Sequence, residues 1–181
     1  KHVLIKRHFK FKYSPIELNC TPILSANMDS CGTLEMSKSL AKLGCLTALH
    51  KFYPNDVVGP HLKEYGKNTF YTLGIREQDR DKFLEYIKVY GQPELICIDV
   101  PNAYLQTFVE YCLWVRSQCP FSIIMAGNCV CSNMTSELVI GGKVDIVKVG
   151  IGPGRTCQTR LVTGVGRGQL TTIDECGETV R

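Results

Sequence analysis

A chain of 181 residues, of which 44% are hydrophobic and 21% charged, has the length and balance of one globular domain with a real core. No stretch approaches the roughly 18 consecutive apolar residues of a membrane span, and the modest net charge of +4 argues against a nucleic-acid partner. The first twelve residues alternate basic and apolar side chains where a signal peptide has a continuous apolar core, so we expect a cytoplasmic protein without a membrane partner.

The chain begins with a basic segment at about residues 1–13. Phe9 and Phe11 alternate there with His8, Lys10 and Lys12, which predicts an exposed β-ribbon with basic side chains on one face. A solvated ribbon, or one that meets a ligand phosphate or another subunit, is favoured over a ribbon that binds nucleic acid.

Six strand-like runs follow, and each has a helical stretch behind it. We expect strands at 22–27, 45–50, 69–74, 95–100, 122–127 and 145–151. We expect helices at 34–43, 55–65, 79–90, 104–118, 134–140 and 169–175. Apolar residues of the fourth helix recur at helical spacing and predict a face that packs on a parallel sheet. These residues are Leu105, Phe108, Val109, Cys112 and Val115.

Polar residues follow nearly every expected strand. They are Asn27 and Asp29, His50 and Lys51, Asp99 and Asn102, Asn128, and the loop around Cys157. An open, doubly wound sheet would concentrate such residues at its switch point, whereas a (β/α)8 TIM barrel carries them around one edge. We therefore expect a single catalytic barrel domain over residues 1–181. It is incomplete, because six βα units are present where a barrel has eight and the C-terminal units are missing.

Most of the ten cysteines are expected to be buried small hydrophobes, because several, such as Cys45, Cys97 and Cys129, lie inside apolar strand-like runs. Cys129 and Cys131 bracket one residue and have no second pair at zinc-finger spacing, which argues against a metal site there. Cys157 differs, because its loop is polar and rich in glycine. Arg160 lies close by, and a nearby cation favours the nucleophilic thiolate.

Thr159 also follows Cys157, but its hydroxyl needs a carboxylate partner before it can relay protons. The glycines Gly150, Gly152 and Gly154 match neither the dinucleotide fingerprint nor a P-loop. They could point successive carbonyls or amides at an ion, or they could form a tight turn and nothing more.

Three charged residues at strand ends have alternative readings. Lys51 is expected to be unpaired, which suits an anionic ligand or a carbonyl to be polarised, although a solvated lysine explains it equally well. Asp99 ends an otherwise apolar strand, and we expect nothing structural to require it. Asp29 is a candidate cap for the following helix.

Five segments resemble, in chain order, motifs of the IMP dehydrogenase/GMP reductase family. They are SANMDSCGT (25–33), ALHKFY (48–53), CIDVPNAY (97–104), MAGN (125–128) and VKVGIGPGRTCQTRLVTGVG (147–166). The match runs over nearly the whole chain, and the last motif is highly specific to the family. The first and third motifs are similar to the reductase branch, and the chain has no room for the regulatory module that the dehydrogenase branch carries.

The resemblance implies a GMP reductase that converts GMP to IMP and ammonia with NADPH. Cys157 would attack C2 of the guanine ring to form a thioimidate, and Thr159 matches the proton-relay threonine of the family. Gly152, Gly154 and Cys157 match positions that bind a potassium ion, with Arg160 beside them. The positions that match contacts to NADPH are Lys51, Asp99, Val100, Pro101, Ile151 and Gly152. The resemblance also implies a homotetramer.

The chain departs from the family pattern in ways that leave alternatives open. Arg155-Thr156 and Gln158 flank Cys157 in place of serine-valine and threonine, and Arg167-Gly168 stands in place of tyrosine-proline. The family's seventh and eighth units, which hold the phosphate, the purine and the glutamate that partners the threonine, are missing. We expect this segment alone to be inactive. The alternatives are an IMP dehydrogenase and a non-catalytic relative that binds nucleotide or a full-length subunit.

Overall fold

The structure is a computed structural model, and it describes residues 3–179. Its strands are β1 (Arg7–Phe9), β2 (Leu18–Cys20), β3 (Leu24–Ser25), β4 (Leu46–Ala48), β5 (Thr69–Leu73), β6 (Leu95–Asp99), β7 (Ile123–Cys129) and β8 (Ile146–Val149). Its helices are α1 (Leu34–Lys42), α2 (Asn55–Tyr65), α3 (Glu77–Tyr90), α4 (Gln106–Gln118), α5 (Ser132–Ser136), the π-helix η1 (Glu137–Gly141), α6 (Thr159–Thr163) and α7 (Gln169–Thr179). None of the helices in this part of the chain is long and apolar enough to span a membrane.

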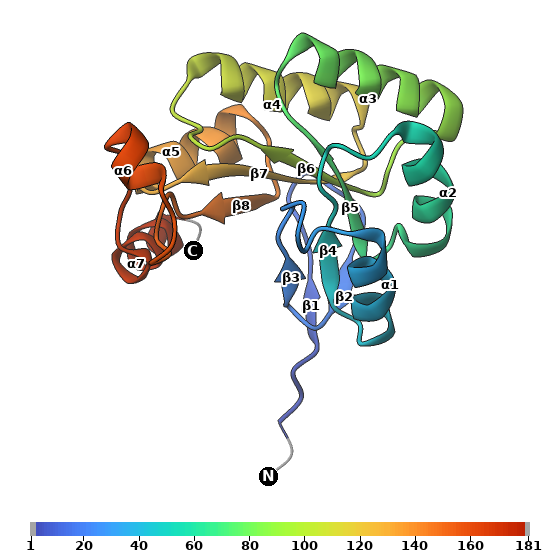
Figure 1. Ribbon diagram of the computed structural model, residues 1–181, viewed down its shortest axis with the longest axis horizontal. Coiled ribbons are helices and arrows are strands. Elements are labelled where there is room, and N and C mark those ends of the chain that lie inside the picture. Colours follow the sequence, from blue (N-terminus) through green and yellow to red (C-terminus); the bar gives the residue numbers. More distant parts are fainter. Residues whose placement is uncertain (1–2, 180–181) are drawn as a thin grey trace.

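The order of the strands distinguishes between the two architectures that the sequence leaves open. The large sheet has the order β3-β4-β5-β6-β7-β8, so each strand lies beside the next one in the chain, and every pair is parallel. A doubly wound sheet reverses its order at a switch point, whereas a barrel does not. The sheet curls, and α2, α3 and α4 cover its outer side (Figure 1). The prediction of an incomplete (β/α)8 barrel is confirmed.

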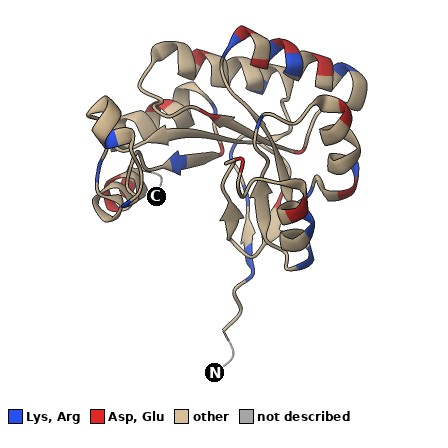
Figure 2. Ribbon diagram, viewed as in Figure 1, with Lys and Arg blue, Asp and Glu red and all other residues tan. Residues whose placement is uncertain are grey.

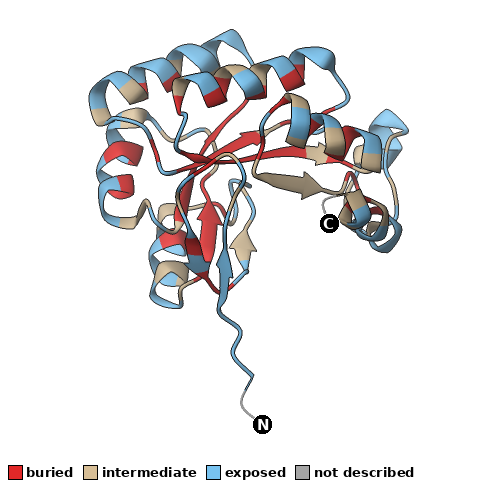
Figure 3. Cartoon of the chain, turned by 180° about the vertical axis from the view of Figure 1, so that it is seen from behind, coloured by how far each residue is buried: buried red, intermediate tan, exposed pale blue. Residues whose placement is uncertain are grey.

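Two apolar clusters lie on the two faces of this sheet. Residues alternate along β6, so that Ile96 and Ile98 pack toward the helices and Leu95 and Cys97 pack toward the barrel interior. A strand that is buried on both faces is apolar throughout, which explains the uninterrupted apolar run of β6 (Figure 3).

The interior cluster is covered only in part. The strand β2 turns Leu18 and Cys20 into it, while the remainder opens onto a hollow of about 640 Å³. Phe70, Met125 and Ile146 line this hollow from the strands, and α7 adds further side chains. The outer strands β3 and β8 each have one neighbour, so two further strands could fit between them and close a barrel of eight.

A buried ion pair ties several elements together at the amino-terminal edge of the sheet. The guanidinium of Arg116 in α4 donates to Asp145 at 2.5 Å and to the carbonyls of Ser122 and Lys143. The Asp145 carboxylate also accepts from the amide of Ile124 at 2.9 Å. Removing one partner of such a buried pair costs about 3–5 kcal/mol, because the other charge is left uncompensated. This edge of a barrel usually contributes stability and not chemistry.

Several helix boundaries differ from the sequence-based predictions. The fourth helix begins at Gln106, and Leu105, which precedes it, is 54% exposed; its place in the buried stripe was therefore predicted wrongly. The fifth continues from α5 into η1, and the expected helix at 169–175 extends to Thr179. Thr33, and not Asp29, caps α1, because its hydroxyl accepts from the Met36 amide at 3.2 Å.

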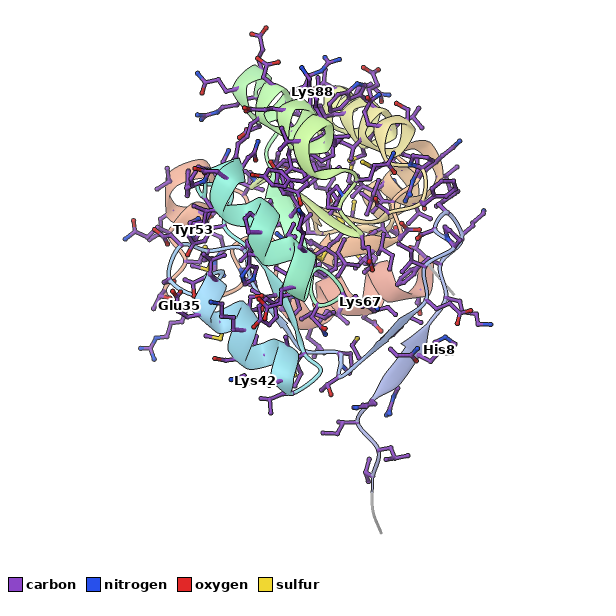
Figure 4. The ribbon with its side chains drawn as sticks, turned by 90° about the vertical axis from the view of Figure 1, so that its right-hand side faces the viewer. His8, Glu35, Lys42, Tyr53, Lys67 and Lys88 are labelled. Carbon is purple, nitrogen blue, oxygen red and sulfur yellow. The ribbon has the colours of Figure 1, made fainter. Side chains whose placement is uncertain are left out.

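The basic N-terminal segment forms an antiparallel ribbon, in which β1 pairs with β2. Of the ribbon expected at 1–13, residues 1–2 lie outside the described residues. The ribbon is less basic than its sequence indicates, because Glu17 accepts from His8 at 2.8 Å and pairs with Lys10 at 3.2 Å. Figure 4 shows His8 on this ribbon, far from α1, whose ends carry Glu35 and Lys42.

Candidate active site

The residues expected to form a site come together at the carboxyl edge of the sheet. Lys51 follows β4, Asp99 ends β6, and Ile151 follows β8. Because all six strands are parallel, these ends meet at one edge. Residues 150–168, here called the thiol loop, leave this edge after β8, include α6, and lead to α7 at one side of the half-barrel (Figure 1).

Cys157 lies in the thiol loop beside Thr159, the residue that the sequence analysis names as its proton-relay partner. Its Sγ is 3.3 Å from Thr159 Oγ1, and the thiol donates to the hydroxyl. When the thiol ionises, the Thr159 hydroxyl and backbone N–H can donate to the sulfur. These hydrogen bonds lower the pKa of Cys157 below its ordinary value; partial burial opposes them, and the charge of Arg160 adds to them.

The buried cysteines behave in the opposite way. Burial raises the pKa of Cys97, Cys119 and Cys129 to about 11 and the pKa of Cys112 to about 12. These thiols stay protonated near neutral pH, and their role is packing, as expected for cysteines in apolar runs. Local surroundings therefore mark Cys157 as a thiol suited to nucleophilic attack.

Glycines let the thiol loop fold tightly over the side chain of Arg160. Gly152 has φ of +59°, a conformation that favours glycine, and a Cβ there would lie 3.0 Å from Arg160 Cγ. A Cβ on Gly166 would lie 2.2 Å from the same atom. The stem of Arg160 thus packs between the two ends of the loop, and the Arg167 amide closes them by donating to the Ile151 carbonyl at 3.2 Å.

The donor chemistry of the loop fits a potassium ion. Residues 3–179 hold no group of three His, Cys, Asp or Glu side chains arranged to bind a metal, so a cation here would depend on backbone carbonyls. The Gly154 carbonyl accepts from the Cys157 amide at 3.1 Å and keeps a second lone pair. The Arg160 carbonyl likewise accepts one hydrogen bond, from the Gly164 amide at 3.1 Å, so the carbonyls of Gly154 and Arg160 each keep one lone pair for a cation.

Lys51 is not the unpaired lysine that the sequence led us to expect. Its ammonium donates to Asp79 in the first turn of α3 at 3.1 Å. Lys82 fixes the backbone beside it by donating to the carbonyls of Lys51 and Tyr53, both at 2.6 Å. The side chain of Lys51 is still 31% exposed, so the ammonium keeps donors for a ligand.

Asp99 has a structural partner, which corrects a second expectation. The ammonium of Lys148 in β8 pairs with Asp99 and donates to Asn27 Oδ1 at 2.8 Å. The three residues come from the ends of β3, β6 and β8, so the contact crosses the open barrel. Lys148 was missed as a site residue, although a lysine inside the apolar run of β8 was a usable signal.

The other expected cofactor positions contribute differently. Val100 and Ile151 are 8% and 2% exposed, and their carbonyls already accept from the amides of Asn128 and Arg167, while Pro101 is exposed. Asn128 lies at the same edge, and its side-chain oxygen is buried without a hydrogen-bond partner in the described part of the chain. Lys51 and Asp99 thus bring a cation and a carboxylate to the same edge of the sheet, and both side chains keep some exposure to solvent. Other charged residues are densest along the outer helix α3 (Figure 2).

The chain is similar to known proteins over nearly its whole length. A family model described as the IMP dehydrogenase / GMP reductase domain matches residues 72–181. The GMP reductases of Vibrio parahaemolyticus and Buchnera aphidicola are each 41% identical to it, over 97% and 95% of this chain. An inosine 5' monophosphate dehydrogenase from Legionella pneumophila superposes with a TM-score of 0.81 at 27% identity, over 97% of this chain and 53% of that one. The chain spans about half the length of the two reductases, 51% and 50%.

Proposed function

Because this chain belongs to the IMP dehydrogenase/GMP reductase family, we propose that the polypeptide containing it is an NADPH-dependent GMP reductase. The reaction converts GMP, NADPH and a proton to IMP, NADP⁺ and ammonia. The similarity to proteins named GMP reductase at 41% identity favours this branch of the family. The observation that carries the proposal is the hydrogen bond between Cys157 and Thr159, in a loop at the carboxyl edge of the sheet.

Cys157 is the nucleophile of the proposed reaction. Its thiolate forms a bond to C2 of the guanine ring, and the exocyclic amino group takes up a proton and leaves as ammonia. NADPH, when bound, supplies the hydride that C2 receives in place of the amino group. The C2–S bond then breaks, IMP is formed, and the electron pair returns to the sulfur. The lowered pKa of Cys157 favours the first and last of these steps, since the thiolate is both attacking and leaving group.

In the proposed reaction, Thr159 carries the proton that ammonia needs. Its hydroxyl lies 3.3 Å from the sulfur, but a threonine hydroxyl is too weak an acid and base to act alone. Within residues 3–179, no carboxylate hydrogen-bonds to the Thr159 hydroxyl. We assign this carboxylate, and the groups that hold the purine and phosphate, to the half of the relatives that this chain does not span.

The cofactor would lie along the strand ends beside the thiol loop. Lys51 and Asp99 offer charged groups there and Pro101 offers an exposed apolar surface, while the buried residues Val100, Ile151 and Gly152 form the backbone beneath them. A potassium ion held by the carbonyls of the loop would fix the backbone on both sides of Cys157. A homotetramer remains a prediction of the family resemblance, and a cytoplasmic location remains a prediction of the N-terminal sequence.

Replacing Cys157 tests the assignment directly. In the complete natural polypeptide, Cys157→Ala should abolish both ammonia release from GMP and the accompanying oxidation of NADPH. Cys31→Ser is the matched control: Cys31 is also partly exposed, its thiol donates to the Ala26 carbonyl, and a serine can keep that bond. Undiminished turnover by Cys157→Ala would overturn the mechanism.

IMP dehydrogenase is the second candidate, and the superposition on a dehydrogenase favours keeping it. The two activities use different nucleotides and different cofactors, so one pair of assays distinguishes them. We expect turnover of GMP with NADPH and none of IMP with NAD. The reverse result would assign the chain to the dehydrogenase branch and would leave Cys157 in the same role.

A further inference from the structure

Arg167 stands at a position where the chain departs from its family, and it occupies the base of the thiol loop. We propose that Arg167 is a positioning residue that anchors this loop and thereby holds Cys157 against Thr159. The inference rests on the proposed function only in naming Cys157 as the nucleophile. The position of the loop itself follows from contacts among the described residues.

The side chain of Arg167 joins the loop to two other elements. Its Nη1 is 2.5 Å from Glu175 Oε2 in α7 and donates to the Val130 carbonyl, just beyond β7, at 2.9 Å. The other carboxylate oxygen of Glu175 accepts from the amide of Ser132 at 3.2 Å and from its hydroxyl at 3.4 Å. One guanidinium and one carboxylate therefore link the end of the loop to β7, to the start of α5 and to α7.

Glu175 is suited to pair with the guanidinium of Arg167. The Ser132 amide and the Arg167 guanidinium lower the pKa of its carboxyl, because both stabilise the ionised form. A charged hydrogen bond that also reaches a backbone carbonyl orients a side chain better than an ion pair alone, because the guanidinium is planar and its donors point in fixed directions.

The backbone of Arg167 transmits this anchoring to the thiol. Its amide donates to the Ile151 carbonyl, which closes the loop. The preceding residue, Gly166, lies against Arg160, whose stem also packs on Gly152. Arg160 follows Thr159 directly in α6, so a displacement of the loop end would move the hydroxyl that bonds to Cys157.

The start of the loop is held by the buried Ile151, but its middle has few buried contacts. No residue of α6 is buried, and its apolar residues Leu161 and Val162 are 86% and 78% exposed. A segment with few buried contacts depends on its ends for its position. The anchor at Arg167 is therefore the interaction whose loss should loosen the loop most.

Reactivity of the thiol provides the test, in the complete natural polypeptide without nucleotide. The rate of Cys157 alkylation by iodoacetamide is measured against pH, with the modified peptide identified by mass spectrometry, and amide hydrogen exchange is followed over residues 150–168. Arg167→Gln should move the alkylation midpoint to higher pH, lower the rate at pH 7 by about threefold as the thiolate fraction falls, and speed exchange in the loop. Arg167→Lys, which keeps the charge but replaces the planar guanidinium by a compact ammonium, should lie between this variant and the wild type.

Arg155→Gln is the matched control, since Arg155 is an exposed arginine of the same loop with no ion pair or side-chain hydrogen bond to the described residues. Glu175→Gln removes the other partner of the ion pair and should reproduce the effect of Arg167→Gln. If one of the two variants folds poorly, the other still tests the inference. An alkylation profile and a loop exchange rate equal to those of Arg155→Gln in both variants would overturn the inference. Because no nucleotide is used, a failure of the proposed reductase activity would leave this result readable.

Discussion

At the scale of single residues, the chain contains thiols in two kinds of surroundings. Burial in apolar clusters raises the pKa of Cys97, Cys112 and Cys129, whereas hydrogen bonds from Thr159 lower the pKa of Cys157. Arg160 contributes less than Thr159 to that lowering. The neighbouring hydroxyl, and not only the neighbouring cation, therefore favours the thiolate form of Cys157.

Thr159→Val tests this role of the hydroxyl. The variant keeps the shape of the side chain but removes its donor, so the pKa of Cys157 should rise and alkylation of Cys157 should begin at higher pH. Turnover of GMP should fall by about 100-fold or more, because the proton relay is lost as well. Thr159→Ser keeps a hydroxyl and is the control. A pH profile that is equal in the valine and serine variants would contradict the prediction.

At the scale of elements, a buried polar network joins α1, α2 and β5. Ser37 Oγ is 2.9 Å from His61 Nε2 and 2.6 Å from Thr69 Oγ1. All three side chains are buried, and burial lowers the pKa of His61, helped by the charge of Lys38. A neutral imidazole is thus built into the packing of the first two helices on the sheet.

The network should make stability depend on pH. At pH 7.5 His61 is neutral in both the folded and the unfolded chain, so its contribution to folding is complete. As pH falls below about 6.5, the ordinary value of histidine, the unfolded chain takes up a proton that the folded one resists, and stability decreases until the lowered folded pKa is reached. Urea unfolding at pH 7.5 and 5.5 measures this loss.

The comparison is with His61→Gln, in which an amide can still bond to Ser37 but cannot titrate. The wild type should lose more stability than this variant between the two pH values. Equal losses would mean that His61 titrates alike in the folded and the unfolded chain.

At the scale of the whole molecule, a stabilising ion pair and the candidate site lie at opposite edges of the half-barrel, and its interior is open. Arg116 and Asp145 lock the amino-terminal edge, and the thiol loop occupies the carboxyl edge. Between them the apolar hollow of about 640 Å³ faces outward. Unpaired edge strands and an exposed apolar face favour association with other chains.

These 181 residues, expressed alone, should therefore bind the hydrophobic dye ANS more strongly than the complete natural polypeptide does. Ile173→Ser, which removes an apolar side chain from the α7 wall of the hollow, should lower the dye fluorescence. Val89→Ser removes a comparably exposed side chain from the outer helix α3 and should not. Dye binding that responds equally to both substitutions would contradict the assignment of the apolar surface to the hollow.

The sequence by itself determined the class of fold and the residue to examine first. Apolar runs and helical spacing are local properties, and they predicted six βα units and hence the incomplete barrel. The glycine-rich segment around Cys157 is likewise contiguous, so its thiol, hydroxyl and arginine could be identified together. Element ends were predicted less well, as at Leu105, because capping geometry decides them.

Only the tertiary structure decided which charged residues meet. Lys148 and Asp99 are 49 residues apart in the chain, and Lys51 and Asp79 are 28 apart. Their contacts depend on strand register and on the curl of the sheet, which local sequence patterns do not specify. Arg167 was visible in the sequence only as a departure from the family. Its anchoring role emerges because the fold brings Val130 and Glu175 to the same guanidinium.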